Sequence, residues 1–102
     1  MLLMKIDVIK KNEVVTLKLD GCLDTAATSE FAAALEDNIQ QKRLVIDMQN
    51  LEFIASSGIR LLVTANKQAV KLGHALAIAN MNEVVADVFD VTGLIDVFEI
   101  IK

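Results

Sequence analysis

Two adjacent hydroxyls, Ser56 and Ser57, are the side chains of this sequence best placed for regulatory chemistry. They stand where a buried strand gives way to the start of an amphipathic helix. The first N–H groups of a helix have no intrahelical acceptor and carry the positive end of the helix dipole. A phosphate on either hydroxyl would meet this anion site and add a charge of roughly −1.5 to −2. The pair is therefore a candidate site for a phosphorylation switch. Because serine is a preferred helix cap, local physics favours the plainer alternative that Ser56 or Ser57 only caps the helix, while Gly58 lets the helix approach its neighbour.

A catalytic role for Ser56 is disfavoured by the position of the only histidine. A nucleophilic serine needs a base within hydrogen-bond reach, and His74 follows the far end of the same predicted helix. From Ser57 to Leu72 the helix rises about 22 Å, and the Gly-x-Ser-x-Gly elbow is absent. A small serine hydrolase is therefore the weakest of the functions considered.

Structural roles explain the remaining reactive side chains better than chemical ones. The acids on or beside the first predicted helix are explained by a solvated face, namely Asp24, Glu30, Glu36 and Asp37. Cys22 stands alone, so it predicts a small buried side chain and no internal disulfide. The sequence has no cluster of His and Cys for a metal and no phosphate-cradling motif, although an all-carboxylate metal site is left open. We expect no cofactor and no enzymatic activity.

Composition indicates one domain over residues 1–102, with an aliphatic core. Of the 102 residues 54% are hydrophobic, while the aromatic side chains are four Phe. This pattern suits a sheet covered by helices. The net charge is −4 with scattered Lys and Arg, which disfavours nucleic-acid binding. A start that turns charged at Lys5, a single cysteine and no apolar run of about 20 residues predict a cytoplasmic protein without a membrane span.

Hydrophobic periodicity predicts strands and helices in alternation. The first two expected strands lie over 6–10 and 15–19; a turn at Lys11-Asn12 separates them, and Gly21 closes the second. Two buried strands are expected over 44–48 and 75–79. A loop with Asn50 and Phe53-Ile54 follows the first of these buried strands. The first expected helix spans about 26–40, with Asp24-Thr25 as its cap. The second begins at Ser56-Ser57-Gly58 and ends at Gly73, and the residues at helical spacing along it are Ile59, Leu62, Val63, Asn66 and Val70. The third runs from Asn82 to near Thr92-Gly93. Residues 96–100 fit a short strand or a helical turn. This order predicts an α/β fold, a mixed central sheet of four to five strands with helices packed against it.

Three segments together resemble the STAS domain of bacterial anti-sigma factor antagonists, and the likeness runs over almost the whole chain. Residues 19–26 (Leu-Asp-Gly-Cys-Leu-Asp-Thr-Ala) resemble the segment that enters the family's first helix. Residues 44–48, followed by Leu51 and Phe53-Ile54, resemble its central strand. Residues 55–62 (Ala-Ser-Ser-Gly-Ile-Arg-Leu-Leu) resemble its signature, Asp-Ser-Ser-Gly-Leu, and a variant Ser-Ser-Ala-Gly-Leu-Arg. Thr92-Gly93-Leu94 also fits a family pattern. Ala55 stands where the signature has aspartate.

The resemblance implies a partner-switching cycle. An anti-sigma factor with serine kinase activity binds the unphosphorylated antagonist, phosphorylates the serine that begins the signature helix and is released, and a serine phosphatase resets the cycle. On this sequence the phosphorylated residue is Ser56. The implied partner-binding residues are Asp24, Ala55, Ser56, Ser57, Gly58 and Arg60. Dimerisation is left open, as is modification of Ser57 instead of Ser56.

A second function fits the same family. The chain could be a constitutive STAS-like subunit of a lipid-transport ATPase or of a stressosome-like assembly. Ser56 and Ser57 would then be only a helix cap. Retention of the signature serine and glycine favours the regulated antagonist over the constitutive subunit.

Overall fold

The computed structural model describes residues 4–39, 43–74, 76–94 and 97–101. Within these ranges, a hairpin is followed by alternating helices and strands. The elements are β1 (Lys5–Lys11), β2 (Val14–Leu23), the 3-10 helix η1 (Thr25–Ala27), α1 (Thr28–Asn38), β3 (Arg43–Ile54), α2 (Ser56–Lys71), β4 (Ala77–Ala79), α3 (Glu83–Thr92) and β5 (Glu99–Ile101). None of these helices has the length and apolar character that crossing a bilayer requires.

The strands form one mixed sheet in the order β1-β2-β3-β4-β5. β1 and β2 pair in antiparallel fashion, and every other neighbouring pair is parallel. Asn12 and Glu13 connect the hairpin with φ angles of 51° and 69°, the positive values that a tight two-residue loop requires. The predicted mixed sheet is confirmed with five strands. Of the segment left undecided over 96–100, Asp96 lies outside the described residues and the rest leads into β5.

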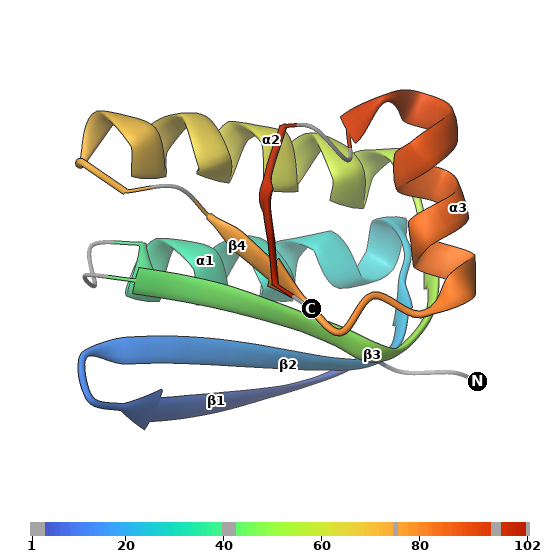
Figure 1. Cartoon of the computed structure of the whole chain (residues 1–102). Coiled ribbons are helices and arrows are strands. Elements are labelled where there is room, and N and C mark those ends of the chain that lie inside the picture. Colours follow the sequence, from blue (N-terminus) through green and yellow to red (C-terminus); the bar gives the residue numbers. More distant parts are fainter. Residues whose placement is uncertain (1–3, 40–42, 75, 95–96, 102) are drawn as a thin grey trace.

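Helices α1 and α2 lie side by side on one face of the sheet, and α3 stands at one end of it (Figure 1). Leu17 of β2 and Ile46 of β3 are fully buried beneath these helices together with Phe31 of α1 and Leu62 of α2. At the other end of the core the rings of Phe89 and Phe98 pack with centroids 5.7 Å apart. The aliphatic core expected from composition is therefore the layer between sheet and helices.

Two strands are longer than the sequence pattern predicts. β2 does not close at Gly21 but continues to Leu23, with register shifts against β3 between Lys18 and Asp20 and again after Gly21. β3 continues through the segment expected to be a loop and ends at Ile54. The irregular pairing breaks the alternation of buried and exposed side chains, and this is why the pattern did not reveal these strand ends.

The predicted helix beginning at Ser56 is confirmed, and three of its five buried residues are Gly or Ala. The buried positions of α2 are Gly58, Leu62, Ala65, Asn66 and Ala69. Val70 was expected among the residues of the helical repeat, but 58% of it is exposed. Ala69 holds the buried position of this turn, so the neighbouring Val70 faces away from the core.

The first helix begins later than expected. Residues 25–27 form η1, and α1 starts at Thr28. The expected end at Gln40 lies outside the described residues, as does Ala75 at the expected start of β4.

Helix α3 is fixed at its start by Asn82, as the sequence predicts, and ends at Gly93 in the left-handed conformation. The Asn82 Oδ1 accepts from the Val85 N–H at 3.0 Å. Its Nδ2 lies within hydrogen-bond distance of three β3 carbonyls, those of Met48, Gln49 and Leu51 (3.2, 3.0 and 2.8 Å). One side chain thus satisfies both a helix end and the irregular stretch of β3.

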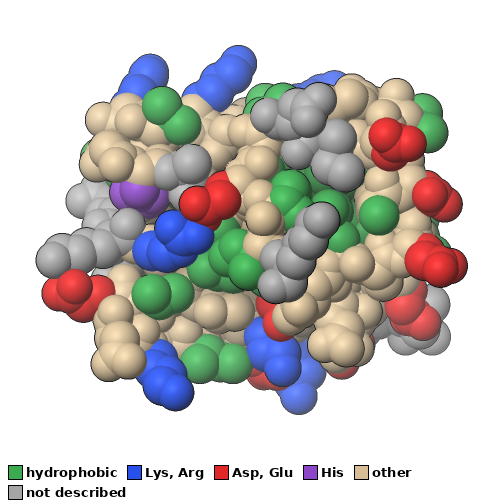
Figure 2. Space-filling view, viewed as in Figure 1, with side chains coloured by type: hydrophobic (Ala, Val, Ile, Leu, Met, Phe, Trp, Pro, Cys, Tyr) green, Lys and Arg blue, Asp and Glu red, His purple; other side chains and the backbone are tan. Residues whose placement is uncertain are grey.

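Figure 2 shows acidic side chains along the edge of the molecule that α3 forms.

Candidate functional site

The candidate site is formed where two neighbouring parallel strands end. β2 ends at Leu23 and β3 at Ile54, and the two residues are register partners. The Ala55 N–H donates to the Leu23 carbonyl at 2.8 Å. The loop that carries Asp24 therefore lies beside the loop that carries Ser56, although 32 residues separate them in sequence.

Asp24 uses its carboxylate within its own loop. The Oδ1 atom accepts from the Ala27 N–H at 3.0 Å and so caps η1. The predicted capping role of Asp24 is confirmed, for the 3-10 helix rather than for α1 directly. Its side chain is half-buried, so the carboxylate orders the loop more than it offers charge to a partner.

The start of α2 lacks a side-chain cap. The cap position is Ala55, whose extended backbone (φ −82°, ψ 161°) suits the role but whose methyl group accepts no hydrogen bond. The Ala55 carbonyl accepts from the N–H groups of Gly58 (2.9 Å) and Ile59 (3.1 Å). Ser56 and Ser57 are the first two helical residues, so the interpretation that either of them caps the helix is wrong. Their own N–H groups have no acceptor within the helix.

Gly58 is buried because α2 crosses very close to the end of β2. A Cβ atom at this position would lie 2.8 Å from both Cγ and Cδ2 of Leu23 and 3.4 Å from Cγ1 of Ile54. Separations under 3.0 Å are not tolerated without movement. The structural explanation of Gly58 is therefore confirmed: the missing side chain allows the close approach.

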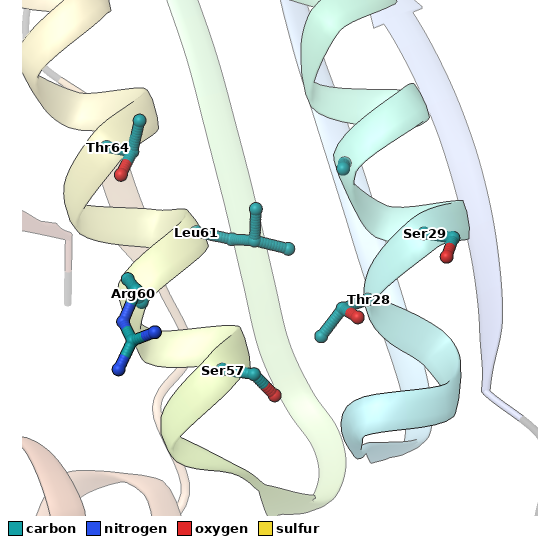
Figure 3. A pocket seen from close by; sticks show the side chains of 7 residues that line it. Thr28, Ser29, Ser57, Arg60, Leu61 and Thr64 are labelled. Atoms are coloured by element: carbon teal, nitrogen blue, oxygen red, sulfur yellow. The ribbon is translucent and has the colours of Figure 1, made fainter.

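The two serines differ in exposure and direction. Ser56 is exposed, whereas Ser57 is half-buried. The Ser57 Oγ lies 3.5 Å from the Thr25 Oγ1, and its side chain points toward α1 (Figure 3). Of the two hydroxyls, that of Ser56 is the one open to a second protein.

Arg60 lies one turn further along α2 and is exposed. Figure 3 shows its side chain running back toward the N-terminal end of the helix, the direction in which helical side chains lean. Arg60 also borders a shallow groove of about 340 Å³ between α1 and α2. The other residues lining it are Thr28, Ser29, Ala32, Ser57, Leu61 and Thr64.

The groove is a part of the site that the sequence did not indicate. Thr25 and Thr28 come from η1 and α1, and no spacing rule connects them with Ser57. Phe53 of β3, three residues before Ser56, adds an aromatic side chain that is half exposed. The register of β2 against β3 brings Thr25 and Thr28 beside Ser57.

His74 is remote from this site. The helix that begins at Ser56 runs unbroken to Lys71, so its length separates the serine from His74 and no serine–histidine pair forms within one chain. Both ring nitrogens of His74 are buried without a hydrogen-bond partner among the described residues. Within the same residues no three His, Cys, Asp or Glu side chains form a group that could hold a metal ion.

Known proteins share this architecture. Residues 5–102 match the family model described as the STAS domain. An anti-sigma F factor antagonist of Paenibacillus polymyxa is 26% identical over 90 residues, which span 85% of this chain and 77% of that protein. The crystal structure of an anti-sigma factor antagonist from Mycobacterium paratuberculosis has a TM-score of 0.85 at 20% identity, covering 96% of this chain and 85% of that one.

A further solved relative is known in two states. The anti-sigma factor antagonist SpoIIAA in its unphosphorylated form has a TM-score of 0.79 at 21% identity, covering 98% of this chain and 89% of that one. The phosphorylated form of SpoIIAA, a cell fate determinant of Bacillus, has a TM-score of 0.73 at 19% identity, covering 98% and 92%. At these identities the structural likeness establishes the fold.

Proposed function

The chain belongs to the STAS domain family, and we propose that it acts as an anti-sigma factor antagonist regulated by phosphorylation of Ser56. In its unphosphorylated form it binds an anti-sigma factor that is also a serine kinase. The kinase phosphorylates Ser56, the complex dissociates, and a serine phosphatase restores the binding form. The relatives named as anti-sigma factor antagonists support the role. The observation that carries the proposal is the exposed hydroxyl of Ser56 on the first turn of α2.

Ser56 is the preferred acceptor over Ser57 on accessibility. A kinase must place its catalytic groups around the acceptor oxygen, and Ser56 is exposed at the surface. The Ser57 hydroxyl faces α1 and lies near the Thr25 hydroxyl. Phosphorylation of Ser57 would have to displace that contact and force a dianion into the groove.

The chemistry of the site explains how a phosphate could reverse binding. The partner surface we propose comprises the loop of Asp24 and the first turns of α2, with Ala55, Ser57, Gly58 and Arg60 around Ser56. Binding would bury this surface. A phosphate adds roughly −1.5 to −2 charges there, and their desolvation opposes association. Because the phosphate stands at the end of a rigid helix, the change is electrostatic and needs no refolding.

The proposed cycle assigns the phosphoryl-transfer chemistry to the partner. The kinase brings ATP and magnesium, and the phosphatase brings the hydrolytic step. This chain serves as substrate and binding module, so we propose no catalytic residue, cofactor or metal for it. The cycle places the protein in the cytoplasm, where sigma factors act.

Binding to the serine-kinase anti-sigma factors of the native organism, purified one by one, tests the proposal. We expect one of them to bind the wild-type protein and Ser56→Ala with similar affinity, and to bind Ser56→Asp more weakly. With ATP and magnesium the mass of wild type should rise by one phosphate, while Ser56→Ala should stay unmodified. Ser57→Ala is the matched control and should be modified like wild type. Equal binding of all variants by the same kinase would contradict the switch and favour a constitutive subunit.

A further inference from the structure

Arg60 is a charged side chain that runs toward the first turn of α2, which carries the proposed phosphorylation site. It lies four residues after Ser56 on α2, so both residues share one face of the helix. Its side chain runs back along the helix toward the turn that Ser56 begins (Figure 3). The order of the pair, with the anion N-terminal to the cation, is the favourable one for a helix.

The Arg60 guanidinium is free to take a new partner. It is exposed, and in the part of the chain that the structure describes it makes no ion pair or hydrogen bond. Arg43 offers a contrast, because its guanidinium already pairs with Glu99 of β5. Arg60 is also the only charged side chain among the described residues that line the groove beside Ser57.

The surroundings of Arg60 favour an added anion. The first turn of α2 contains no acid and its cap position has no acceptor side chain. A cation near this end of a helix interacts unfavourably with the helix dipole. A phosphate on Ser56 would oppose both effects, and the planar guanidinium matches phosphate oxygens in a two-pronged arrangement.

We propose that Arg60 is the intramolecular counter-ion of phosphorylated Ser56 and is thereby withdrawn from the partner surface. This inference rests on the proposed function and specifies how release works. In the unphosphorylated protein Arg60 pairs with a carboxylate of the kinase. After phosphorylation the same guanidinium is held by the phosphate of its own helix. The partner then loses a cation as well as facing a new negative charge.

The test is a phosphorus NMR titration of the full chain with phosphoserine installed at position 56 by genetic code expansion. The second pKa of phosphoserine is about 6, and a facing arginine lowers it because the cation favours the dianion. From the strength of helical i,i+4 pairs we expect this pKa to be roughly 0.2–0.4 lower in wild type than in Arg60→Gln. Arg60→Lys should recover part of the shift. The difference should shrink in about 1 M salt, where the screening length is about 3 Å.

Lys67→Gln is the matched control, because Lys67 is an exposed cation of the same helix eleven residues from Ser56. It should titrate like wild type. The acids of the adjoining elements, Asp24 before η1 and Glu30 in α1, are present in every variant and cancel in the comparison. An Arg60→Gln protein that titrates like wild type would overturn the inference. Because the phosphate is installed without a kinase, that result leaves the proposed function standing. Failure of every kinase to modify Ser56 would overturn the proposed function without altering the titration.

Discussion

Replacing Ala55 with aspartate should stabilise the protein, because the structure provides every part of a helix cap except the side chain. The Ala55 backbone is extended and its carbonyl already accepts from Gly58 and Ile59. An aspartate carboxylate at this position can accept from the Ser57 N–H, which has no acceptor within the helix. No acid stands in the first turn to compete with it or repel it.

The expected gain for Ala55→Asp is about 1 kcal/mol in the free energy of unfolding. Side-chain caps contribute about 0.5–2 kcal/mol, and the Gly58 N–H, one of the two usual donors, is already bonded to the Ala55 carbonyl. For a domain of this size the melting temperature should rise by roughly 4–8 °C. Urea unfolding followed by circular dichroism measures the change, because the chain has no Trp or Tyr for fluorescence.

The pH dependence separates the capping bond from other effects. Capping holds the new carboxyl pKa below its ordinary value of about 3.9. The gain is therefore fully present above that value and is lost as pH falls through the lower pKa of the folded state. Ala55→Asn is the matched control, a neutral cap whose gain should not follow this titration. An Ala55→Asp protein no more stable than wild type at pH 7 would refute the description of the α2 start.

Three further substitutions test the packing around the site and the core. Gly58→Ala should lower the free energy of unfolding by about 1–2 kcal/mol, since overpacking against Leu23 exceeds the gain in helix propensity. Urea unfolding should show a smaller loss in a Leu23→Ala background, whereas strictly additive effects of the two substitutions would contradict the close contact. Asn82→Ala should lower the free energy of unfolding by about 2–3 kcal/mol, because the cap of α3 and the hydrogen bonds to β3 carbonyls are lost together. A loss under about 0.5 kcal/mol in the same assay would show that water replaces the amide. His74→Leu should leave thermal stability at pH 7 unchanged or higher, since the buried ring nitrogens have no partner among the described residues; a loss above about 1 kcal/mol would reveal a hydrogen bond to the ring.

Periodicity predicted the elements whose buried faces are regular. The alternation of Val15, Leu17 and Leu19 and the helical repeat through Leu62 both follow from a core on one side. The same logic failed where the backbone is irregular. β3 continues to Ile54 past a register shift against β2, and Asn82 donates to β3 carbonyls in this irregular stretch. No local pattern connects residues some thirty positions apart.

The site was predicted in part for a similar reason. The change from a buried strand to an amphipathic helix located Ser56 at a helix start. The sequence did not distinguish a capping serine from a serine in the first turn, because the difference is one residue in the position of the cap. Ala55 takes that position through its backbone and its bond to Leu23. The groove that Thr28 lines and the contact of Thr25 with Ser57 depend on the register of distant strands and were not predictable from spacing.

The most direct test of the regulated-antagonist account is the intact mass of the protein isolated from its native cells, before and after phosphatase treatment, with fragment mapping. A regulated antagonist should carry a single phosphate on Ser56 in part of the population, removed by the phosphatase and absent from Ser57. Repeated absence of phosphate across growth and stress conditions would contradict it. Ala55, in place of the signature aspartate, would then mark a STAS domain that binds its partner constitutively.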